Sequence, residues 1–146
     1  MSDRGEIRAK VIEIFKKIQK KDGYHNDMAD VFAKLVDWKT AGTLPVTSVM
    51  LGLEVGEWAD ESEDLTARHL MLVVTGCIEA AIEDMEQAID DYVDDIETAL
   101  LNNSLDLFTN TQAKNFLVYH VEPELITDAV NKAFVGIGVK ILYYHE

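Results

Sequence analysis

The sequence predicts an α+β fold, with an antiparallel or mixed sheet of four to five strands and two main helices packed on it. Two segments repeat apolar residues at helical spacing, and four others alternate in polarity or run apolar as strands do. The order is helix, short apolar segment, two strands, helix, two strands, which is typical of helices packed on one sheet. With 146 residues, 48% of them hydrophobic, the chain is expected to form one domain, residues 1–146.

The first helix is expected to begin at Ser2 or Asp3 and to end at Asp22-Gly23. Asp3 and Glu6 fit a capping box, and glycine is common just beyond a helix end. The apolar face of this helix consists of Ile7, Val11, Ile14, Phe15 and Ile18. The opposite face is basic and is either a solvated surface or a contact surface: Arg8, Lys10, Lys16, Lys17, Lys20 and Lys21.

A hairpin is expected in the first half of the chain. The short apolar segment 31–38 fits either a strand or a helix. Residues 46–55 alternate in polarity and are predicted to form a strand, and the acidic residues 56–64 a long loop. Residues 68–78 are apolar on both faces, which predicts a strand in the centre of the sheet.

Residues 81–101 predict the second helix, because one apolar stripe continues through them at helical spacing. The stripe consists of Ala81, Ile82, Met85, Ala88, Ile89, Tyr92, Val93, Ile96, Ala99 and Leu100. The acids are expected to lie off this stripe. Like charges four residues apart, such as Asp90 and Asp94, each cost about 0.2–0.5 kcal/mol, which packing of the stripe must offset.

The C-terminal part predicts a loop and two strands. Residues 102–115 are rich in Asn and Thr, which favours a loop. The next strand is expected to end at Glu122-Pro123. The last strand places five apolar side chains on one face, namely Val135, Ile137, Val139, Ile141 and Tyr143. Gly136 and Gly138 lie on its other face, where glycine within a strand indicates close approach of another group.

Charge is strongly segregated along the chain, whose formal net charge is −14. Most of the 13 Lys and Arg residues precede residue 40, whereas residues 69–113 contain none. The acids of that stretch are Glu79, Glu83, Asp84, Glu86, Asp90, Asp91, Asp94, Asp95, Glu97 and Asp106. Such acidity argues against a nucleic-acid binder and against an anionic membrane surface. The segregation favours a subunit whose basic surface meets an acidic surface of its neighbour.

We expect a protein of the cytoplasm, without a membrane span. No stretch approaches twenty apolar residues, and the first ten residues are charged where a secretory signal needs an apolar run. Cys77 is the only cysteine and falls within an apolar run, so we expect a buried and unreactive thiol.

The search for catalytic patterns predicts no enzyme, no cofactor and no metal. No glycine-rich phosphate loop or serine elbow is present, and His25, His69, His120 and His145 lack the spacing of metal ligands. The run Asp90-Asp91-Tyr-Val-Asp94-Asp95 could hold Mg²⁺, and it resembles the aspartate-rich motif of isoprenoid synthases. That family needs a much longer, all-helical chain, so we interpret the run as an acidic face.

Trp58 is a candidate contact residue, because it is a large aromatic side chain in an acidic segment. It either folds back onto its own sheet or inserts into a pocket of a neighbouring subunit, as tryptophan often does at interfaces.

Taken in order along the chain, these elements make it resemble the tail-terminator (tail-completion) proteins of tailed bacteriophages. The resemblance covers nearly the whole chain through many weak signals. They are Gly23-Tyr24-His-Asn-Asp27, Val31-Phe32, Leu44-Pro45-Val-Thr-Ser-Val49 with Gly52 and Glu54, the strand Leu70–Ile78, the helix Glu83–Leu101, Val121-Glu122-Pro123 and Val139–Tyr144. The second helix is more acidic than is usual in the family.

The resemblance implies a structural virion protein of the tail or neck, assembled in the host cytoplasm. Its partners would be further copies in a ring, typically of six, the tail tube protein and a head or neck connector protein. DNA would pass through the ring without specific binding. We expect subunit contacts at Arg8, Lys16, Lys20, Glu57, Trp58, Asp60 and Glu61, and a bore lined by Asp90, Asp91, Asp94 and Asp95 or by residues 57–64.

Three alternatives stay open at this point. The chain could be another neck or head-completion ring protein, which would bind filled heads rather than tail tubes. It could be a small acidic ligand- or protein-binding α+β domain, which would need a concave polar site. It could also be an acidic DNA mimic that binds a basic partner protein.

Overall fold

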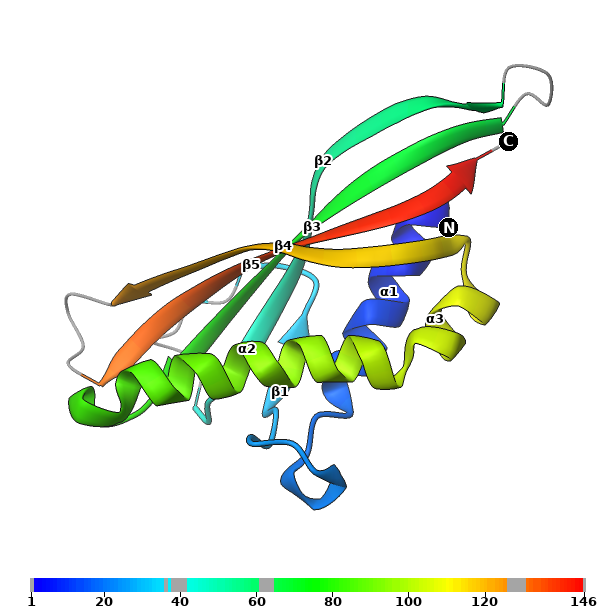
Figure 1. The fold of residues 1–146 in the computed structure, drawn as a ribbon. Coiled ribbons are helices and arrows are strands. Elements are labelled where there is room, and N and C mark those ends of the chain that lie inside the picture. Colours follow the sequence, from blue (N-terminus) through cyan, green and yellow to red (C-terminus); the bar gives the residue numbers. More distant parts are fainter. Residues whose placement is uncertain (1, 36, 38–41, 61–64, 126–130, 146) are drawn as a thin grey trace.

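Five strands form one mixed sheet in the order β1-β2-β3-β5-β4, with helices on one of its faces (Figure 1). The structure is a computed structural model that describes residues 2–35, 37, 42–60, 65–125 and 131–145, and the side chains of these residues except 53–60, 65, 66 and 145. The predicted α+β fold is confirmed, including the mixed sheet and the two main helices.

The sheet is built from three antiparallel pairings and one parallel pairing. β2 (Val46–Asp60) pairs with β3 (Leu65–Glu79), β3 with β5 (Lys132–His145), and β5 with β4 (Ala113–Leu125), all antiparallel. The short strand β1 (Asp30–Phe32) adds to β2 in parallel. β3 is the third of the five strands and is paired on both edges, so the central position predicted for residues 68–78 is confirmed.

The helices cover the sheet from one side. α1 (Asp3–Lys16) begins at Ser2, whose hydroxyl accepts a hydrogen bond from the Gly5 backbone N–H. α2 (Met85–Asn102) follows a short 3-10 turn at Ile82–Asp84, and α3 (Ser104–Asn110) follows α2 almost directly. The first helix is shorter than expected, because a separate 3-10 turn (Lys20–Asp22) closes on Gly23 at a φ of 96°.

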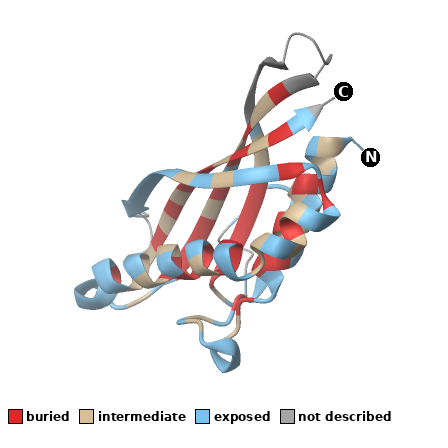
Figure 2. Cartoon of the chain, turned by 45° about the vertical axis from the view of Figure 1, so that its right-hand side comes forward, coloured by how far each residue is buried: buried red, intermediate tan, exposed pale blue. Residues whose placement is uncertain are grey.

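One apolar core fills the space between the helices and the sheet (Figure 2). The predicted face of the last strand is confirmed, since its five apolar side chains are all buried. The predicted apolar face of α1 is confirmed in the same way by its buried residues.

Tyr92 of α2 is fully buried in this core and depends on a glycine of the sheet. Its hydroxyl lies 2.6 Å from the Thr47 hydroxyl, which also lies 3.2 Å from the Met28 sulfur. A Cβ atom at Gly76 would overlap the Tyr92 ring. Burial raises the pKa of Tyr92 far above its usual value, so the phenol stays neutral and hydrogen-bonded.

Three further expectations about element boundaries were wrong, and so was one about a glycine. Strand β2 continues through residues 56–60, which were expected to be loop, because they pair with β3 up to Asp60–Leu65. Residues 102–115 contain α3 and the start of β4, because Leu107 is fully buried in the core and holds a helical turn in place. Strand β4 continues past Pro123 to Leu125, paired with Ala133. The close approach of another group that was expected at both strand glycines is confirmed at Gly138, because a Cβ atom there would overlap the Tyr119 ring. It is wrong for Gly136, where a Cβ atom would meet only the Glu122 carbonyl oxygen, at an ordinary 3.5 Å.

Candidate assembly surfaces

The outer face of α2 is acidic and exposed. Glu86, Asp90, Asp94 and Glu97 are exposed, and Asp91 is partly exposed and accepts a hydrogen bond from Gln87 at 2.8 Å. These carboxylates lie on the side of the helix that faces away from the sheet, as its periodicity predicted. The face can repel polyanions, because nothing in the described residues neutralises Asp90 or Glu97.

Asp95 does not belong to this face, and the expectation that every acid lies off the apolar stripe was wrong. Its side chain is 1% exposed. It accepts hydrogen bonds from the backbone N–H of His25 at 2.8 Å, the backbone N–H of Asn26 at 2.9 Å and the Asn26 side-chain amide at 2.9 Å. A buried carboxylate needs such partners, so Asp95 anchors the segment after α1 to α2.

His25 extends this anchor to the exposed face. Its Nε2 lies 2.9 Å from Asp94 Oδ2, and its Nδ1 lies 3.9 Å from Asp91 Oδ1. The hydrogen bond with Asp94, assisted by the neighbouring carboxylates, raises the pKa of His25. His25, Asp94 and Asp95 bring potential metal ligands within 4.8 Å of one another. Their hydrogen bonds to each other and to the backbone already account for this geometry.

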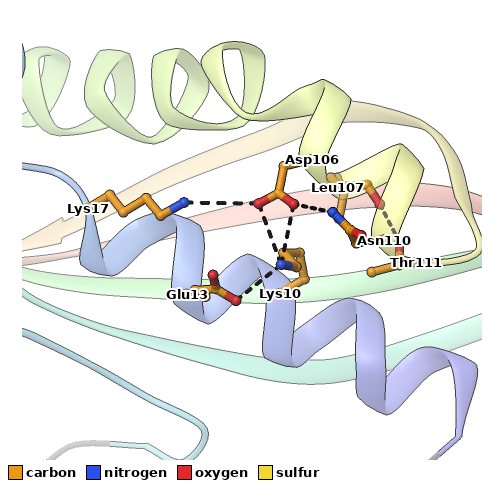
Figure 3. A network of polar contacts seen from close by, with 7 residues as sticks. All are labelled: Lys10, Glu13, Lys17, Asp106, Leu107, Asn110 and Thr111. Atoms are coloured by element: carbon orange, nitrogen blue, oxygen red, sulfur yellow. Dashed lines mark hydrogen bonds and ion pairs between the residues drawn. The ribbon is translucent and has the colours of Figure 1, made fainter.

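Some basic side chains on or next to α1 form ion pairs with acids of the same chain (Figure 3). Lys10 Nζ lies 3.4 Å from Asp106 of α3 and 3.2 Å from Glu13, and Lys17 Nζ lies 4.0 Å from Asp106. The Asn110 side chain also donates to Asp106, and this bond together with the lysines lowers the pKa of the carboxyl. α3 is therefore tied to α1 by charge as well as by Leu107.

The residues expected at subunit contacts fall into two groups. Lys16 and Lys20 are exposed and Arg8 is partly exposed, so these three are accessible to a partner. Glu57, Trp58 and Asp60 lie on strand β2, but their side chains and the whole of Glu61 lie outside the described residues. A contact between these two groups stays a prediction.

An apolar groove, which the sequence did not indicate, lies between α2 and the end of edge strand β4. Its volume is about 400 Å³, and it is lined by Ile82, Met85, Glu86, Ile89, Pro123 and Leu125. Ile82 is 55% exposed and Leu125 54% exposed.

A second apolar feature lies at the other end of α2. Leu101 is 64% exposed, and Leu105 on α3 is 79% exposed. Leu101 also borders a shallow hollow of about 200 Å³ that includes Phe116, Leu117 and Val118. Large exposed leucines grouped at one end of a helix are a common sign of a contact surface.

The helix-free face of the sheet carries a hollow of about 420 Å³, lined by Leu35, Val46, Ser48, Thr75, Cys77, Glu122, Glu124, Phe134 and Gly136. Cys77 is buried there, as expected, and burial raises the pKa of its thiol. A neutral thiol is a poor nucleophile. The described lining contains no histidine or cation that could activate it.

In the part of the chain that the structure describes, no helix has the length and apolar character needed to cross a bilayer.

The comparisons with known proteins give a fold and no family. No family model matches the sequence, and no curated protein matches it. Among solved structures, the chain is similar to one in the virion of a native gene transfer agent particle, at 12% identity and a TM-score of 0.51. That likeness covers 99% of this chain and 98% of the other. The fold is therefore one that also occurs, over its whole length, in a component of a virion.

Proposed function

We propose that this chain is a non-enzymatic structural protein of a phage-like virion that acts as a tail terminator. Copies would form a ring, of six subunits, at the head-proximal end of the tail tube. The ring would end tube polymerisation and provide the docking surface for the neck. The observation that carries the proposal is the end-to-end likeness to a chain of a gene transfer agent virion.

The charge of the molecule supports the same proposal. A ring that DNA crosses needs a bore that does not bind phosphate, and binding would need a basic surface instead. The exposed carboxylates of α2 are suited to line such a bore, and among the residues first expected there Asp90, Asp91 and Asp94 are accessible. Asp95 is not part of the proposed lining, because it is buried within its own subunit.

The first test is assembly and partner choice. We expect light scattering and negative-stain images to show closed rings, alone or on added tail tubes, and we expect the protein to cap purified tubes. Binding to filled heads but not to tubes would assign the chain to head completion instead. Binding to neither would contradict a role in the neck.

The second test concerns the bore. Reversing charge with Asp90→Lys and Asp94→Lys should leave rings intact but make them retain duplex DNA at low salt, since lysines attract phosphate. Asp22→Lys with Glu6→Lys is the matched control, because both residues are exposed on or near α1. Equal DNA retention by the two double variants would show that the α2 face does not line the bore.

A further inference from the structure

We infer that copies of this chain contact each other head to tail, with Leu105 and Leu101 of one copy inserting into the α2–β4 groove of the next. The inference rests on the proposed ring and names the contact that would build it. It uses the exposed apolar groups at the two ends of α2: the groove near Ile82, and Leu101 in the last turn of α2 with Leu105 of α3.

The groove and the exposed leucines are both apolar and are therefore chemically compatible. Among the described side chains that line the groove, Met85, Ile89 and Pro123 are apolar, and Glu86 is the one that carries a polar group. A small polar ligand would find few groups to fix its orientation there. Branched aliphatic side chains such as leucine fill an apolar groove of this kind without leaving a polar group unpaired.

Charge differs between the two ends: the groove end is acidic, whereas the leucine end carries the acids Glu97 and Asp106 together with lysines. The groove end is acidic, since Glu83, Asp84, Glu86, Glu122 and Glu124 are all exposed. At the leucine end, Lys17 extends from α1 to Asp106, the residue next to Leu105, and its side chain is 49% exposed. Lys114 is exposed shortly after α3. Lysines beside the inserted leucines would meet carboxylates beside the groove, which favours this register over groove against groove.

Position along the helix makes the contact heterologous. Glu86 and Leu101 are separated by roughly 20 Å, because an α-helix rises about 1.5 Å per residue. The donating and receiving surfaces are thus different patches, so each copy can use both at once. Contacts of this type close into rings or extend as filaments, whereas a two-fold dimer would use one patch twice.

The test uses one variant for each half of the contact. Leu105→Asp removes the inserted group and Leu125→Asp places a charge in the groove, and each should weaken self-association by more than 10-fold. An equimolar mixture should then form 1:1 dimers, because one intact groove meets one intact pair of leucines. Leu35→Asp is the control, since Leu35 is 67% exposed on the helix-free side of the sheet.

Sedimentation velocity and mass photometry would give the masses. Dimers only in the mixture support the inference, and they also show that both variants are folded. Wild-type-like assembly of either variant, a mixture that stays monomeric, or a wild-type chain that is monomeric at its highest soluble concentration would each overturn it. Oligomers that are lost in both the Leu105→Asp and the Leu125→Asp variant, but that do not bind tail tubes, would contradict the proposed function and not this contact.

Discussion

Replacing Asp95 by alanine tests whether the segment after α1 is held by a buried carboxylate. The side chain accepts three hydrogen bonds, from two backbone N–H groups and one amide, at 2.8–2.9 Å. Each hydrogen bond to a charged acceptor contributes about 1.5–3 kcal/mol. Water can reach the part-buried donors in the variant and recover part of this, so we expect Asp95→Ala to lower the free energy of unfolding by about 3 kcal/mol.

The assay is urea unfolding at neutral pH followed by far-UV circular dichroism, with a thermal scan beside it. For a chain of this size, about 3 kcal/mol corresponds to a melting temperature lower by about 6–12 °C. Asp90→Ala is the matched control, because Asp90, five residues earlier on α2, is the same residue type and is exposed. We expect it to change stability by less than about 0.5 kcal/mol. A loss below about 1 kcal/mol for Asp95→Ala, with an unchanged urea slope, would refute the reasoning.

Two further predictions concern the core and pH. Gly76→Ala should cost about 1–3 kcal/mol in chemical unfolding, because its Cβ would overlap the buried Tyr92 ring. Gly42→Ala, which meets no described atom within 4 Å, should not cost this much, and equal losses would contradict the overlap. The raised pKa of His25 means that its pairing with Asp94 stabilises the fold fully below about pH 6.5 and ceases to do so as pH rises through the folded pKa. Asp94→Asn should therefore lose more stability at about pH 6 than at about pH 9, and a pH-independent difference would exclude the effect.

Local patterns predicted the four long strands of the sheet because each carries its own signal, whereas the segment that contains the short strand β1 fitted a strand or a helix equally. Residues 68–78 are apolar on both faces, and the alternation in β5 marks which face is covered, so both could be assigned without knowing their partners. The patterns were weaker at the ends of elements. Residues 56–60 look like loop alone and become strand because β3 offers a paired backbone.

Other features depend on contacts between distant parts of the chain and could not be predicted locally. Asp95 has the same sequence surroundings as its acidic neighbours, and its burial depends on the backbone N–H groups of His25 and Asn26. α3 forms in a segment rich in Asn because Asp106 meets lysines of α1 and Leu107 reaches the core. The groove was missed for a similar reason, since Ile82 and Leu125 belong to elements that approach only in the folded chain.

The two proposals constrain each other through the geometry of α2. If the contacts between copies lie at the two ends of this helix, its outer face takes no part in them and is repeated on one surface of the ring. That face carries Asp90 and Asp94, so six copies would bring many like charges together and oppose closure. The apolar insertion of Leu105 would have to offset this repulsion. Salt screens the repulsion between the carboxylates but does not weaken the apolar contact. Salt also screens the lysine–carboxylate pairs at the contact. An assembly held mainly by the apolar insertion should therefore be strengthened by added salt, whereas a ring held mainly by those lysines would be weakened by it.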